Sequence, residues 1–173
     1  MTHYIALLRG VNVGGHRKLP MAELKATLTG LGYQQVRTLL ASGNVVVEAA
    51  KTTAAKLEGR LEGDLKTRFG LSTDVIVRDP EEWEAIIAAN PFHKEAQSHP
   101  SRLLMMALKE TPSAEARAFL KAWQGPELVH VVDRAAFIFF GEGMAESKLN
   151  LTKLGVGTAR NWNTVLKLKA MIS

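Results

Sequence analysis

The chain has 173 residues, of which 46% are hydrophobic and 23% charged, and it carries a formal net charge of +5. It has no cysteine, which excludes disulfides, thiolate metal sites and cysteine nucleophiles. Its length suits one large core or two small domains. No apolar run approaches the roughly 20 residues of a membrane-spanning helix, so we expect a cytoplasmic protein that does not enter membranes.

The first half alternates between strand and helix patterns. A continuous apolar run at 3–8 is typical of a strand buried on both faces. Ser42, Gly43 and Asn44 join two β-rich runs as a tight hairpin. The predicted elements are strands over 3–8, 36–41, 45–47 and 73–77, and helices that begin at Pro20 and Lys51. This βαββαβ order predicts an α+β, ferredoxin-like plait with an antiparallel sheet.

The second half repeats the pattern of the first. Residues 21–28 match 113–120, and 36–47 match 129–140, which predicts an internal duplication. We place the domain limits at 1–79 and 80–173. Asp79 precedes Pro80 and a helix, as an N-cap does. The expected elements are strands over 102–108, 128–132 and 137–140, with Phe119 on the inner stripe of a helix. Where a last strand is expected, a glycine turn at 154–164 leads into a C-terminal helix.

Residues 9–18, here called the basic loop, combine three glycines with three fixed cations and no acid. The loop follows the first strand, and glycine lets backbone N–H groups approach an anion. His16 and Arg17 replace the Lys-Ser/Thr of a phosphate-binding P-loop. The loop therefore predicts either an anion site or a plain solvated connection. The candidate ligand-binding residues are Arg9, Gly10, Asn12, Gly14, Gly15, Arg17 and Lys18.

The turn at 154–164 again places glycine beside a cation. Arg160 and Asn163 are its candidate ligand-binding residues, and Trp162 offers a stacking ring. The alternative is that Thr158 caps the helix, Trp162 packs in the core, and Asn163 and Thr164 face water. We expect Trp162 to pack, because large aromatic side chains at helix starts are usually buried.

Other chemistry finds little support in the sequence. His93 and His99 have no third ligand near them, so we expect no metal site. Phe137 and Phe139 alternate as RNA-stacking residues do, but the surrounding RNA-recognition motif is absent and core packing is the better interpretation. No pattern identifies catalytic residues or a cofactor.

Four motifs together resemble one family. They are RGVNVGG at 9–15, LPM at 19–21, ASGNV at 41–45 and GTARNWNT at 157–164. Their combination is similar to the bacterial domain of unknown function 1697, over nearly the whole chain. The resemblance implies two plait-like halves and implies no activity.

The leading hypothesis is a binding protein for an anionic ligand, either a small molecule such as a nucleotide or a nucleic-acid phosphate. The basic loop and the C-terminal turn would share this site. One alternative is an enzyme that acts on a phosphorylated small molecule, with His16 as acid or base. Another is a structural homodimer that uses the basic loop as its interface.

Overall fold

The computed structural model describes residues 1–15, 17–141 and 143–173. The chain divides into two compact units. One unit is Met1–Trp83 together with Leu168–Ser173, and the other is Glu84–Lys167. No helix in the described parts of the chain is long and apolar enough to cross a membrane.

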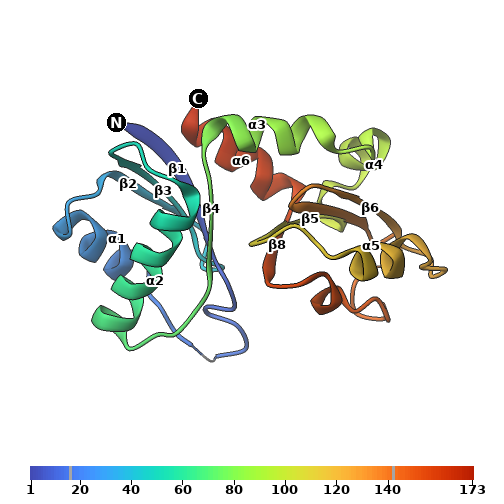
Figure 1. Ribbon diagram of the computed structural model, residues 1–173, viewed down its shortest axis with the longest axis horizontal. Coiled ribbons are helices and arrows are strands. Elements are labelled where there is room, and N and C mark those ends of the chain that lie inside the picture. Colours follow the sequence, from blue (N-terminus) through green and yellow to red (C-terminus); the bar gives the residue numbers. More distant parts are fainter. Residues whose placement is uncertain (16, 142) are drawn as a thin grey trace. The chain divides into compact units, whose positions relative to one another are not determined.

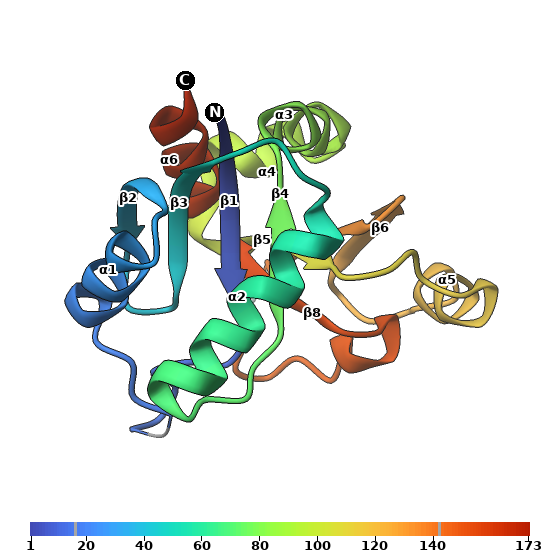
Figure 2. The ribbon, with the colours of Figure 1, turned by 60° about the vertical axis from the view of Figure 1, so that its left-hand side comes forward.

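The first unit is a four-stranded antiparallel sheet in the order β2-β3-β1-β4. Helices α1 and α2 cover one face of it (Figures 1 and 2). Its elements are β1 (Thr2–Leu8), α1 (Met21–Gly30), β2 (Gln34–Leu39), β3 (Asn44–Ala49), α2 (Ala54–Phe69) and β4 (Val75–Arg78). The predicted plait order is therefore confirmed. Helix α2 begins three residues after Lys51 because the Thr53 side chain accepts a hydrogen bond from the Lys56 N–H and caps it.

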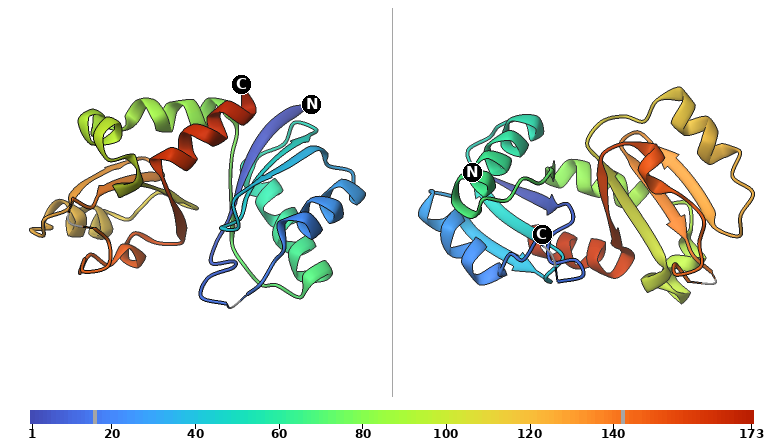
Figure 3. Two further views of the ribbon diagram at one scale, coloured as in Figure 1. Left: turned by 180° about the vertical axis from the view of Figure 1, so that it is seen from behind. Right: turned by 90° about the horizontal axis from the view of Figure 1, so that it is seen from below.

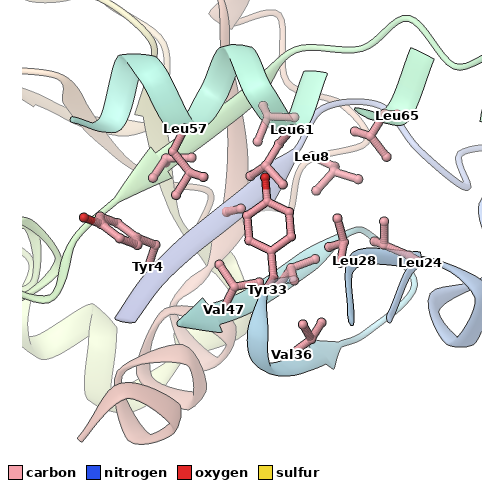
Figure 4. Packing of buried hydrophobic residues seen from close by; sticks show 14 of the residues in the cluster. Tyr4, Leu8, Leu24, Leu28, Tyr33, Val36, Val47, Leu57, Leu61 and Leu65 are labelled. Atoms are coloured by element: carbon pink, nitrogen blue, oxygen red, sulfur yellow. The ribbon is translucent and has the colours of Figure 1, made fainter. Parts of the chain in front are cut away.

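The core of this unit lies between the helices and the sheet (Figure 4). Leu57, Leu61 and Leu65 from α2 share it with Leu24 and Leu28 from α1. The opposite face of β1 is also buried, since Ile5 and Leu7 are at most 1% exposed. Burial on both faces explains why β1 reads as an unbroken apolar run.

Both outer strands of this sheet carry features that discourage further pairing. At β4, the Val75 N–H donates to Glu62 Oε2 and the Val77 N–H donates to Glu58 Oε2, each at 2.9 Å. The two glutamates lie one helical turn apart on α2. At β2, the register shifts between Gln34 and Arg37, where Gln35 has a φ of 49°. Carboxylates and bulges both protect sheet edges.

The second unit contains a sheet in the order β6-β7-β5-β8 (Figure 3). Leu120 of α5 and Leu154 of η2 pack on one face. Strand β8 corrects the prediction that a turn replaces the last strand. The remaining elements are α3 (Pro80–Ala89), α4 (His93–Ser98), η1 (Pro100–Arg102), β5 (Leu103–Leu108), α5 (Ala114–Lys121), β6 (Leu128–Val132), β7 (Ala135–Phe139), η2 (Leu151–Leu154), β8 (Gly157–Asn161) and α6 (Trp162–Ile172).

The two units have the same strand order, as the predicted duplication requires. Helix α2 corresponds in chain order to the short 3₁₀ helix η2. The equivalence extends to single residues, because Leu8 pairs with Val75 as Leu108 pairs with Gly157. It follows that Arg9 corresponds to Lys109 and Arg78 to Arg160.

The ends of the fourth strands are alike in both units. Arg78 and Arg160 are both buried, and each donates through Nη1 to the carbonyl of the preceding residue at 2.9 Å. The next residue in each case caps a helix. Asp79 accepts from the Glu82 N–H, as predicted, and Asn161 accepts from the Thr164 N–H. The duplicated segment therefore continues past the fourth strand into α3 and α6.

Several smaller predictions need correction. Phe119 is only partly buried, whereas Ala116 and Leu120 fill the core. Phe119 instead contacts Trp123 and the Lys153 ammonium group. The cap of α6 is Asn161 rather than Thr158, because α6 begins at Trp162 and the Asn161 side chain accepts from the Thr164 N–H. The limits 1–79 and 80–173 remain a prediction about independent folding.

Candidate functional site

The basic loop connects β1 to α1 and is held at two buried positions. Val11 and Leu19 are each 1% exposed, and both belong to the hydrophobic core of the first unit. Between them, Val13, Gly14 and Gly15 are exposed. Residues 13–15 are therefore exposed, and a residue on each side of them is anchored in the core.

Asn12 holds the two ends of this turn together. Its Oδ1 accepts from the Leu19 N–H at 2.7 Å, and its Nδ2 donates to the Leu19 carbonyl at 2.9 Å and to the Ala41 carbonyl at 2.7 Å. The Asn12 N–H donates to the Arg17 carbonyl at 3.0 Å. The Asn12 side chain thus fixes the loop, so its most direct role at a ligand site is to position other groups.

Left-handed backbone recurs along the loop. Asn12 has a φ of 54° and Arg17 a φ of 53°, a conformation that asparagine tolerates better than most residues other than glycine. Gly14 and Gly15 continue the pattern with φ of 57° and 77°. Two exposed glycines in this conformation bring the bare backbone to the surface of the turn.

The arginines from the two ends of the loop are fixed to one short segment, residues 72–74. The Arg9 N–H donates to the Asp74 carbonyl at 3.0 Å, and its guanidinium lies 3.5 Å from Asp74 Oδ2. The Arg17 guanidinium donates to the Ser72 carbonyl, and the Thr73 hydroxyl donates to the Arg9 carbonyl. Arg9, Arg17 and Lys18 all remain exposed. The fold thus brings two exposed guanidinium groups to neighbouring residues.

The hairpin between β2 and β3 contacts the basic loop and the end of β1. The Leu8 N–H donates to the Gly43 carbonyl at 2.9 Å, while Ala41 accepts from Asn12. Gly43 has a φ of 90°, and a Cβ there would lie 2.7 Å from Val11 Cγ2. The sequence indicated a hairpin here but not its contact with the loop. Residues 72–74 were missed because they contain no glycine or cation.

The predicted C-terminal turn, which the structure shows as β8 and the start of α6, is built differently from the basic loop. Arg160 is only 7% exposed, and its Nη1 donates to Thr158 Oγ1 at 2.7 Å and to the Ala159 carbonyl. Burial lowers the pKa of Arg160 to about 10. Trp162 is 5% exposed and meets the buried Phe137 ring edge-on, which confirms that both aromatics pack in the core. Asn163 is exposed, whereas Thr164 is buried, contrary to expectation.

The predicted site residues therefore fall into two groups. Arg9, Gly10, Asn12, Gly14, Gly15, Arg17 and Lys18 lie together in the first unit, and Arg160 and Asn163 lie in the second. A site shared by both groups stays a prediction. His16, the acid or base of the enzyme hypothesis, lies outside the described residues.

Comparisons with known proteins identify a family of unknown function and a similar solved structure. The sequence profile of a family described as "Protein of unknown function (DUF1697)" matches residues 1–137. The conserved bacterial protein SP0830 from Streptococcus pneumoniae has a similar structure, with a TM-score of 0.80 and 24% sequence identity over 99% of each chain. No curated protein matches. The structural likeness supports the fold of two similar halves.

Proposed function

Because this chain belongs to the DUF1697 family, whose function is unknown, we propose a function from its own geometry: the basic loop binds an anionic ligand. The observation that carries this proposal is the fixing of Arg9 and Arg17, both exposed, to residues 72–74. A guanidinium has five N–H donors in a rigid fork and suits phosphate oxygens. Two such groups on one short segment can act on the same anion.

The existing contacts of these arginines leave them able to bind. The Arg9–Asp74 pair spans 3.5 Å between side chains that are 44% and 39% exposed. Exposed pairs of this kind contribute only about 0 to 1 kcal/mol, so a ligand with more than one charged oxygen can replace Asp74. The bond from Arg17 to Ser72 is made by the Nη2 atom of the guanidinium. Lys18 adds a third exposed cation to the loop.

A small phosphorylated molecule fits this loop better than a sequence-specific nucleic-acid site. Base readout in single strands uses exposed aromatic rings, whereas Phe137 is fully buried and Phe139 is partly buried. Contact with a nucleic-acid backbone would then be weak and insensitive to sequence. A cytoplasmic location remains part of the proposal and is tested by cell fractionation.

The test is calorimetric titration with pyrophosphate. We expect Arg9→Ala and Arg17→Ala to weaken binding by roughly tenfold or more, since charge-assisted hydrogen bonds contribute about 1.5 to 3 kcal/mol. Arg68→Ala, which removes an exposed arginine from α2 in the same unit, should leave affinity unchanged. Equal affinity in all four proteins would refute the site.

Two further measurements separate the alternatives. Arg160→Ala combined with Arg9→Ala tests the shared site, because coupled residues depart from additivity. Sedimentation of Arg17→Ala tests the homodimer that uses the loop as its interface. Hydrolysis of pyrophosphate that depends on His16 would favour the enzyme.

A further inference from the structure

Strand β6 is the outer strand of the second sheet, and its register shows which of its groups point outward. The Phe140 N–H donates to the Arg102 carbonyl, and the Leu108 N–H donates to the Arg134 carbonyl. Even-numbered residues of β7 therefore point their backbone groups toward β5, and odd-numbered ones point toward β6. Because His130 is opposite Phe137 in the ladder, the N–H and C=O groups of Val129 and Val131 point away from the sheet.

The other three sheet edges carry a blocking feature, and β6 does not. Glu58 and Glu62 bind the outer N–H groups of β4. A register shift interrupts β2, and the Arg160 side chain binds the Ala159 carbonyl of β8. Strand β6 pairs in unbroken register over all five residues. Across residues 1–15, 17–141 and 143–173, no side-chain or turn hydrogen bond involves Val129 or Val131.

A groove runs beside this open edge. It has a volume of about 310 Å³ and lies between α5 and β6, with Leu120, Val129 and Val131 among its apolar lining. Arg117 and Lys121 line it from α5, one helical turn apart, and both are exposed. On the strand, Leu128 is 42% exposed. The edge thus combines backbone hydrogen-bonding groups, apolar surface and two cations.

We propose that β6 binds an acidic extended peptide segment of a partner protein, which adds a fifth strand to the second sheet. Strand addition at an open edge uses main-chain hydrogen bonds for affinity and alternate side chains for specificity. Side chains of Val129 and Val131 pack toward the core beneath α5, so the partner's side chains on that face meet Arg117 and Lys121. Those on the other face lie beside the exposed Leu128. The fitting segment alternates acidic and apolar residues.

The test measures fluorescence anisotropy of short labelled peptides with the full chain. The first peptide alternates valine and glutamate, the second alternates valine and lysine, and the third has the first one's composition with its glutamates in one block. We expect the first to bind roughly tenfold more tightly than either of the others, since charge complementarity and alternation both select it.

Variants separate the backbone contribution from the charge contribution. Val131→Pro removes one outward N–H without removing a ladder hydrogen bond, and proline is tolerated at such a position of an edge strand. It should weaken binding of the valine–glutamate peptide by about fivefold. Val131→Ala keeps that N–H and is its control. Arg117→Glu with Lys121→Glu should abolish the preference for glutamate, whereas Lys56→Glu on α2 should not.

Two results would overturn the proposal. One is equal binding of the three peptides, or binding that resists the Arg117→Glu and Lys121→Glu changes. The other is self-association of the chain that Val131→Pro abolishes, because the edge would then be occupied by a second copy. If Val131→Pro fails to fold by circular dichroism, the peptide ranking and the charge variants still decide the outcome.

Discussion

At the scale of single residues, the basic loop depends on one asparagine. The Asn12 side chain makes three hydrogen bonds, two of them to Leu19, and its backbone is left-handed. A motif rich in glycine and arginine draws attention to phosphate chemistry, and the sequence therefore suggested Asn12 as a ligand donor. Its contacts show that the Asn12 side chain instead holds the loop in its conformation.

Asn12→Gly should destabilise the protein by about 2 to 4 kcal/mol, because it removes three hydrogen bonds and keeps the backbone conformation. Asn12→Ala should cost about 1 kcal/mol more, since alanine disfavours positive φ. The free energy of unfolding from urea titration measures both. An Asn12→Gly protein as stable as the parent would show that these bonds do not fix the loop.

Gly43 gives a second prediction at this scale. Gly43→Ala should cost several times more than Gly70→Ala, because both positions have positive φ but only Gly43 is crowded. At Gly70 the new Cβ meets no atom within 4 Å, so the cost is the backbone strain of about 1 kcal/mol. At Gly43 the Cβ also clashes with Val11 and Leu8. Similar denaturation midpoints for the two variants would contradict this packing.

At the scale of elements, the patterns predicted strands and helices well where burial is regular. The apolar run of β1 and the four-residue spacing of Leu57, Leu61 and Leu65 each reflect one repeated geometry. Strand β8 was missed because its five residues, GTARN, carry small and polar side chains. Its place is set by pairing with β5, a contact distant in sequence. The contacts of Arg9 and Arg17 with residues 72–74 could not be predicted for the same reason, since these residues are also distant in sequence.

The glutamates beside β4 should contribute to stability and protect this edge of the sheet from aggregation. Glu58→Ala should destabilise the first unit by about 1 to 3 kcal/mol, because the Val77 N–H loses its partner in a buried place. It should also increase aggregation by opening the edge of β4. Urea denaturation and light scattering measure the two effects. Glu81→Ala, an exposed glutamate of α3, is the control, and equal behaviour of the two variants would exclude an edge role.

At the scale of the whole molecule, the first unit is not continuous in sequence. Leu168–Ser173 belongs to it, and the Arg37 guanidinium donates to the Met171 carbonyl. Duplication of the fold could be predicted because helix stripes and hairpins recur in order. The return of the C-terminus to the first unit could not, since no local pattern encodes it.

A fragment of residues 1–79 should therefore be much less stable than the full chain. It lacks both Leu168–Ser173 and the fully buried Trp83, which belong to the same unit. Large apolar side chains contribute about 1.5 to 3 kcal/mol each when buried. Circular dichroism during thermal unfolding measures the difference. A fragment as stable as the intact protein would support the predicted boundary at residue 79.

The corresponding loops of the two halves differ in length. The connection between β1 and α1, which contains the basic loop, spans residues 9–20, whereas the connection between β5 and α5 spans only residues 109–113. Both connections begin alike, since the Arg9 and Lys109 N–H groups each donate to the residue before the fourth strand. The shorter connection of the second half therefore shows what the same scaffold looks like without the basic loop. A chimera that carries residues 109–113 in place of 9–20 would keep the scaffold and lose everything that the longer connection adds.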